Sequence, residues 1–279
     1  MPKSKSRKKK KNIQINTKRK KAKSKPIFPT GIAFINFNHN IDKKKYPSSN
    51  KILQNNSNYK NLGTYLNILY RVSTCHDYCS KNDHTLEYLT GRSYNLAKSG
   101  LNLMLAGFYD ETWGNIRSLC EITNLFYLFF IDVECFNKWL KLSDQKRMYD
   151  YSPAKVRDKI KGRGKEAPVS FQYYRKLCET SIHVTPNTRP NSYNEHGIPF
   201  VGGKIMKEPL EAVLSDLANI AYLNVTLATT LINPEPIKNA YFDEINENCL
   251  HEETFEWKLF KIDEKYYYQR NKAGNIYKF

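Results

Sequence analysis

Residues 111–131 read ETWGNIRSLCEITNLFYLFFI, and this stretch is the strongest indication of the fold class. Its apolar side chains recur at intervals of three and four residues, which places them on one face of an α-helix. The second half of the stretch is mostly apolar, so we expect this helix to lie at the centre of a packed bundle. The residues of the apolar face are Trp113, Ile116, Leu119, Ile122, Leu125, Phe126, Leu128 and Phe129.

The same helical spacing continues on both sides of this stretch. Asp83, Asp110 and Ser152 are expected N-caps, and Gly107 is an expected helix end. A long helix opened by Pro209 should end at Pro234, with one more helical turn after Ile237. The sequence therefore predicts a mainly all-α fold, a multi-helix bundle over residues 60–250. Besides the central helix, the expected helices cover residues 62–72, 83–107, 134–142, 153–160, 170–183 and 209–234.

The two ends of the chain have a different composition from the bundle. Residues 1–59 are rich in Lys, Asn, Ser and Pro and predict a disordered basic tail followed by a linker. Near the other end, apolar and charged residues alternate from Phe255 to Leu259, and residues 271–274 carry a turn signal. We therefore expect a small β-rich appendage over residues 251–279.

The positive charge of the chain is concentrated at its N-terminus. The formal net charge is +18, and residues 1–25 hold thirteen of the 45 Lys and Arg residues and no acidic residue. Such a block binds polyanions, most often nucleic acid, although a solubilising tail is the alternative. The nucleic-acid-binding candidates are Arg7, Lys8, Lys9, Lys10, Lys11, Lys18, Arg19, Lys20 and Lys21.

Cysteine usage and hydropathy indicate the compartment. The six cysteines are scattered and no secretory leader precedes them, so we expect reduced thiols and a cytoplasmic protein. The longest apolar run, Leu125 to Ile131, is far shorter than the roughly 20 residues of a membrane-spanning helix, so no membrane partner is expected. A homodimer is left open.

A polar cluster is expected inside the bundle. Arg117 and Glu121 lie one turn apart on its most apolar helix, so they should be buried as a pair unless that face meets solvent. Glu179 and His183, four residues apart, and Arg157 are the expected partners from other helices. Helical bundles build sites from such inward polar groups, so His183, Arg117, Glu121 and Glu179 are the catalytic candidates. A structural network that fixes the helix register is the alternative.

A second pair of candidate residues lies further along the chain. Arg189 and His196 have six residues between them, which resembles the Arg-x(4–6)-His spacing of the HEPN ribonuclease superfamily. In those enzymes the histidine and arginine activate a ribose 2′-hydroxyl and stabilise the phosphate charge, a reaction that needs no metal. Pro190 places this segment in a loop, whereas the motif of that superfamily sits at a helix.

Cysteine and histidine also occur in a spacing that invites comparison with metal sites. Cys75, His76 and Cys79 would occupy one helical turn, and Cys249 with His251 would be needed to complete a zinc site. The spacing C-x3-C on a helix is not a zinc-finger pattern, so we expect a core cysteine pair, no metal and no cofactor.

Several blocks in order resemble a family of uncharacterised bacterial helical proteins, known as domains of unknown function. The blocks are residues 105–111, LAGFYDE, and 116–121, IRSLCE, then WL at 139–140, YSPAKVR at 151–157, YRKLCE at 174–179 and HVTP at 183–186. The resemblance covers roughly residues 85–232. It implies a bacterial source and points to the residues in its blocks, among them Arg117, Glu121, Arg157, Glu179 and His183.

Two functions follow as hypotheses. The first is a helical binding or scaffold protein whose basic tail contacts nucleic acid. The second is a HEPN-like, metal-independent ribonuclease acting as a toxin or defence effector, with His183 or His196 as the catalytic histidine.

Overall fold

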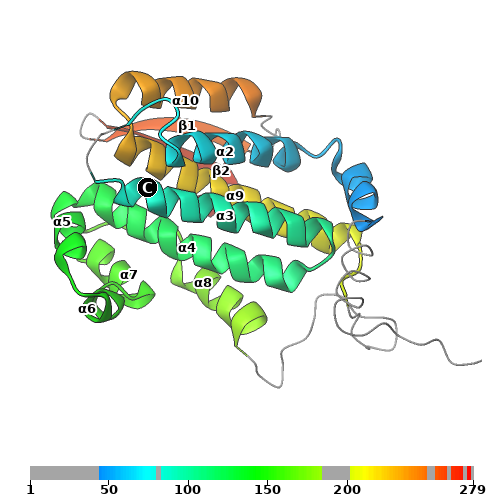
Figure 1. Ribbon diagram of the computed structural model, residues 1–279, viewed down its shortest axis with the longest axis horizontal. Helices are drawn as coiled ribbons and strands as arrows, with labels where there is room; N and C mark the ends of the chain where they lie inside the picture. The colour runs from blue at the N-terminus through cyan, green and yellow to red at the C-terminus, as the bar shows by residue number, and fades with distance from the viewer. Residues whose placement is uncertain are drawn as a thin grey trace, which may run out of the picture. The chain divides into compact units, whose positions relative to one another are not determined.

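A computed structural model describes residues 44–79, 83–183 and 202–249 with their side chains, and residues 255–262, 265–272 and 275–277 by their backbone. Over the residues described with side chains the chain is mainly helical (Figure 1). The predicted helical bundle is therefore confirmed for this part. Two predictions fall on residues outside the described ones: the basic tail with its candidate nucleic-acid contacts, and the loop that contains Pro190.

Residues 44–53 form a helix where we expected linker. Leu53 and Ser49 are fully buried, and the Ser49 hydroxyl donates a hydrogen bond of 2.8 Å to the carbonyl of Leu105. The linker prediction is wrong here. So few apolar residues of this segment contact the core that no stripe is visible in the sequence.

The next three helices have ends that the sequence explains. Helix α2 (Ser57–Ser73) begins where the Asn56 side chain accepts a hydrogen bond from the backbone of Tyr59. In helix α3 (Thr85–Leu105) His84 occupies the N-cap position, but the Asp83 carboxylate accepts a hydrogen bond of 2.9 Å from the first backbone N–H of the helix, that of Thr85. In α4 (Tyr109–Ile131) Phe108 occupies the N-cap position and Asp110 lies in the first turn, so the prediction of Asp110 as the cap is wrong.

The turn between α3 and α4 confirms Gly107 as the end of a helix. Gly107 has φ +85°, the left-handed conformation in which helices commonly terminate. A Cβ atom on this residue would lie 2.7 Å from backbone atoms of Lys204. Glycine is therefore required here both by the backbone conformation and by the close approach of another chain segment.

Helix α9 (Lys207–Ile232) shares the centre of the bundle with α4. It packs against α2, α3 and α4, and Figure 1 shows it behind α3. The predicted central position of the 111–131 helix is therefore shared by α4 and α9. Alternating small and large side chains along α9, such as Ala218, Ala221 and Leu217, allow neighbouring helices to approach it.

A buried asparagine joins three of these helices. The Asn224 amide on α9 donates to the Thr123 hydroxyl of α4 at 2.8 Å, and its carbonyl accepts from the Ser93 hydroxyl of α3 at 3.0 Å. Asn224 is fully buried. Because a buried amide without partners is costly, this arrangement favours one register of the three helices.

Shorter helices cover the far half of α4 with a second apolar cluster that contains Phe126, Leu128, Val156 and Ile160. After α8 the chain forms a single-turn π-helix. This turn takes the place of the last part of the helix predicted at residues 170–183. Helix α6 was not predicted, because it has no buried residue and therefore no apolar stripe. The elements are α5 (Val133–Lys141), α6 (Asp144–Asp150), α7 (Pro153–Lys161), α8 (Phe171–Leu177) and the π-helix (Cys178–Ile182).

Helix α10 (Glu235–Asn248) follows α9 and is much longer than the single turn predicted. Beyond it, the backbones of β1 (Phe255–Ile262), β2 (Lys265–Lys272) and β3 (Asn275–Tyr277) pair antiparallel in that order. Their side chains lie outside the described residues, so a folded β-rich appendage stays a prediction. Among the described helices, none has the length and hydropathy needed to cross a membrane.

Candidate functional site

Three helices bring polar side chains together around the phenol of Tyr174. Arg117 and Glu121 on α4 form an ion pair with 2.9 Å between Nη2 and Oε1. The hydroxyl of Tyr174, on α8, accepts from Arg117 Nη2 at 2.6 Å and donates to Glu121 Oε1 at 2.6 Å. The guanidinium of Arg157, on α7, lies 5.1 Å from the centroid of the Tyr174 ring. We call Arg117, Glu121, Arg157 and Tyr174 the Tyr174 cluster.

The Tyr174 cluster is half-buried and reaches solvent. The side chains of Arg117 and Glu121 are 26% and 32% exposed, so this pair is not sealed in the core. Burial and the hydrogen bond to Glu121 raise the pKa of Tyr174 above its usual value. Burial alone would lower the pKa of Arg117, but hydrogen bonding to Cys178 and the charge of Glu121 raise it. Arg117 therefore remains a cation and Tyr174 a neutral donor at every physiological pH.

Not every predicted partner joins the Tyr174 cluster. Glu179 instead pairs with Arg175 on the exposed surface of α8 and the π-helix, with 2.6 Å between Nε and Oε1. His183 is exposed and follows the π-helix, and its backbone N–H donates to the carbonyl of Cys178 at 2.8 Å. Arg189 and His196 lie outside the described residues, as do the tail residues.

Two buried arginine nitrogens of the Tyr174 cluster, Nε of Arg117 and Nη1 of Arg157, have no hydrogen-bond acceptor among the described residues. Arg157 contacts aromatic rings instead of carboxylates, with its guanidinium 5.2 Å from the centroid of Phe171 as well. Buried donors of this kind favour an acceptor such as a phosphate oxygen. Sequence reasoning missed Phe171 and the role of Tyr174, because both contacts join separate helices.

The surroundings of α7 are basic and carry exposed aromatic rings. Residues 153–183 hold eight Lys or Arg and three Asp or Glu, while the rest of residues 26–279 is balanced at 24 of each. On the side of α7 that faces α6, Lys155 lies over Tyr149 at 3.1 Å and Lys159 over Tyr151 at 5.2 Å. On the α8 side Arg157 lies over Phe171. We call residues 144–183 the α7 region.

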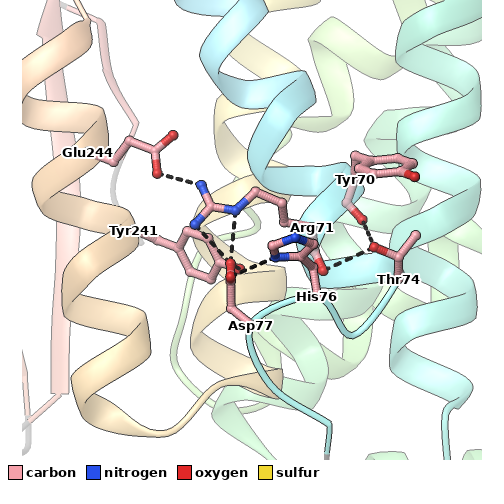
Figure 2. A network of polar contacts seen from close by, with 7 residues as sticks. All are labelled: Tyr70, Arg71, Thr74, His76, Asp77, Tyr241 and Glu244. Carbon is pink, nitrogen blue, oxygen red and sulfur yellow. Dashed lines mark hydrogen bonds and ion pairs between the residues drawn. The ribbon is translucent and has the colours of Figure 1, made fainter.

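A separate polar network ties the end of α2 to α10 (Figure 2). Arg71 bonds to Asp77 at 2.8 Å through Nε and to Glu244 at 2.6 Å through Nη1. Tyr241, almost fully buried, donates to Asp77, and His76 contacts the other oxygen of the same carboxylate. Burial would raise the pKa of Asp77, but hydrogen bonds from Tyr241, His76 and Arg71 lower it to about 2. The network fixes the chain that follows α2.

The cysteines do not follow the sequence prediction. Helix α2 ends at Ser73, so Cys75 and Cys79 lie in the connection to α3, and Cys79 is exposed. A core cysteine pair is therefore wrong for these two residues. Cys249 is buried near Tyr65 and Thr64, away from Cys75 and Cys79. His251 lies outside the described residues.

Comparisons of the chain with models of known protein families, with curated proteins and with solved structures found no match.

Proposed function

We propose that the protein is a non-catalytic, helical nucleic-acid-binding protein, with the basic tail and the α7 region as its two contact surfaces. One observation carries the proposal. Within residues 26–279 the surplus of positive charge lies in the α7 region, next to aromatic rings that face solvent. Tyr149 is 69% exposed and Phe171 is 52% exposed, and each has a Lys or Arg over its ring.

Cations interleaved with exposed aromatic rings fit a single-stranded nucleic acid. The phosphates of a strand attract Lys and Arg, while unpaired bases stack on aromatic faces without sequence preference. Arg157 combines both features, because its cationic guanidinium lies over the rings of Phe171 and Tyr174. A duplex hides its bases, so it offers the rings nothing to stack on. We therefore expect single strands to bind more tightly than duplexes at the α7 region.

The experiment measures the affinity of the full chain for a labelled single strand of about 16 nucleotides. Replacing Tyr149 or Phe171 by Ala should weaken binding about tenfold, since stacking contributes roughly 1–3 kcal/mol per base. Tyr88→Ala is the matched control, because Tyr88 on α3 is 73% exposed but lies outside the α7 region. Equal affinities for all three variants and the unaltered chain would refute a role of the α7 region.

The tail is tested by deletion of residues 1–25. If about half of its thirteen cations bind phosphates of a single strand, the deletion should flatten the salt dependence of binding by about 0.7 for each phosphate that the tail neutralises. The melting temperature should stay nearly unchanged, because the described core lies wholly outside this segment. An unchanged salt slope would show that the tail is only solubilising.

The second candidate function is a metal-independent ribonuclease, and one observation favours it. The π-helix Cys178–Ile182 precedes His183 and packs against α4, and π-helical turns are frequent at functional sites. RNA cleavage in the presence of a chelator, lost in His183→Ala or His196→Ala with folding intact, would replace the binding function by this one. No cleavage by the unaltered chain would exclude it.

The remaining expectations are part of the same proposal. We infer a cytoplasmic protein of bacterial origin that belongs with the helical family it resembles, with residues 251–279 as a β-rich appendage. Light scattering of the purified chain at several concentrations distinguishes a monomer from a homodimer.

A further inference from the structure

The connection between α2 and α3 places three metal-ligating side chains together. Cys75 follows the last turn of α2 and Cys79 and His84 precede α3. One ligand atom from each residue can be chosen so that all three lie within 4.8 Å of one another. None of these residues belongs to the Tyr174 cluster or to the α7 region.

The distances in this group are close to those of a tetrahedral site. Cys75 Sγ lies 3.6 Å from His84 Nδ1, and Cys79 Sγ lies 4.0 Å from His84 Nε2. A sulfur about 2.3 Å and a nitrogen about 2.05 Å from a common tetrahedral centre are about 3.6 Å apart. The two sulfurs contact different nitrogens of the His84 ring, so binding of both to one ion requires a shift of the ring or of one sulfur, in a group whose ligand atoms already lie within 4.8 Å of one another.

A buried carboxylate beside the histidine is a second, independent observation. Glu87, in the first turn of α3, is only 4% exposed, and its Oε1 lies 3.4 Å from His84 Nδ1. Within the described part of the chain Glu87 forms no ion pair with Lys or Arg. Metal-binding histidines commonly have such a carboxylate as partner of the second ring nitrogen, where it orients the ring. An uncompensated buried carboxylate also favours a cation nearby.

The chain between the two cysteines is held in place before any metal binds. Asp77, midway between Cys75 and Cys79, is fixed by Arg71 and Tyr241 (Figure 2). Cys75 has φ +54°, an uncommon conformation for a residue other than glycine. The network therefore lowers the entropy lost when the two sulfurs are brought onto one ion.

We propose that Cys75, Cys79 and His84 form a binding site for Zn²⁺ or a similar thiophilic divalent ion, with Glu87 as the positioning carboxylate. On binding, each thiol releases its proton to solvent and coordinates as a thiolate, while His84 coordinates as the neutral ring. Three protein ligands leave the fourth tetrahedral position to water. Since Cys79 is exposed, an ion can enter from solvent.

The test adds Co²⁺ to the full chain, metal-free and kept reduced by a phosphine. We expect one Co²⁺ ion to bind per chain and to give the visible bands of tetrahedral cobalt and a thiolate charge-transfer band. Zn²⁺ should displace the Co²⁺ ion and remove these bands. Cys75→Ser, Cys79→Ser and His84→Ala should each abolish these bands. Because Cys79 is exposed, Cys79→Ser folds normally and keeps the test decisive even if Cys75→Ser does not fold. Glu87→Gln should retain the bands but weaken the affinity about 10–100-fold.

His183→Ala and Cys249→Ser are the matched controls, an exposed histidine and a buried cysteine outside the group. Both should bind cobalt like the unaltered chain. The proposal is overturned if no bands appear, if they persist in Cys79→Ser, if either control removes them, or if Cys75 and Cys79 form a disulfide under the reducing conditions.

Discussion

The phenol of Tyr174 donates a hydrogen bond of 2.6 Å to the carboxylate of Glu121, which joins α8 to the central helix α4. The same hydroxyl accepts from Arg117, so it bridges the two members of an ion pair. The bridge gives α8 a polar attachment at the border of the core. It also holds the aromatic face of Tyr174 against Arg157.

Tyr174→Phe removes both hydrogen bonds and keeps the ring. We expect the free energy of unfolding in urea to fall by about 1–2 kcal/mol, since each partly exposed hydrogen bond contributes about 1 kcal/mol or less and Glu121 loses a donor. Tyr149→Phe is the control, because that side chain is largely exposed. Equal losses in the two variants would mean that the bridge does not stabilise the fold.

Glu121→Ala should lower the free energy of unfolding by about 1–2 kcal/mol. This is less than the roughly 3–5 kcal/mol expected for a sealed ion pair, because the side chains of Arg117 and Glu121 are partly exposed.

Asn224→Ala should be among the more destabilising single changes in the core. It leaves the hydroxyls of Ser93 and Thr123 without the amide that now lies between α3, α4 and α9. We expect a loss of roughly 2–3 kcal/mol in the free energy of unfolding, because these groups have no access to water. Asn102→Ala, at an exposed position of α3, is the control and should change stability little. A small effect of Asn224→Ala would show that the hydrogen bonds of these hydroxyls to the carbonyls of Leu89 and Leu119 are enough to satisfy them.

The long helices were predictable because their stability depends on an apolar stripe that the sequence displays. Ser152, at the N-cap position of α7, and Gly107, which ends α3, were found from residue type because helix ends have local residue preferences. Helix α6 was missed because it has no buried residue, and residues 44–53 were missed because their few apolar side chains form no regular stripe. Their helical state depends on what they pack against, which no local pattern records.

The same division holds for the candidate sites. The pair of Arg117 and Glu121 was predictable, because residues four apart on a helix are neighbours. Tyr174 was not predictable, since it reaches Glu121 from another helix, 53 residues away. The group of Cys75, Cys79 and His84 was missed for a different reason: α2 ends at Ser73 instead of continuing through the cysteines, so the chain turns back and brings His84 to them.

Acid should remove the contribution of Asp132 to stability. Asp132 caps α5 and pairs with Arg163, and although burial would raise its pKa, the hydrogen bonds from Arg163 and the Cys135 N–H lower it below 3.8. A carboxylate with a lowered folded pKa stabilises the fold above its unfolded pKa, and this contribution is lost as pH falls through the folded pKa. Asp132→Asn keeps an N-cap and removes the charge.

The unaltered chain should thus exceed Asp132→Asn in unfolding free energy by about 1 kcal/mol at pH 7, and the difference should vanish well below about pH 4. Urea unfolding at a series of pH values measures this difference. Asp144→Asn is the control, because Asp144 is 92% exposed and its pair with Arg147 is screened by solvent. A difference independent of pH would assign the effect to the cap alone.

Two glycines should respond to Ala with opposite signs. Gly107→Ala forces a side chain into the left-handed region, which costs about 1–2 kcal/mol, and places Cβ 2.7 Å from the backbone of Lys204. The free energy of unfolding should fall by more than about 2 kcal/mol. Gly63 lies within α2 with open space around its Cα, so Gly63→Ala should raise stability by roughly 0.5–1 kcal/mol through helix propensity. Thermal unfolding of the two variants beside the unaltered chain measures both effects. A stabilising Gly107→Ala would mean that the segment at Lys204 moves away freely, and the close packing of that segment on the α3 to α4 turn would then not hold in solution.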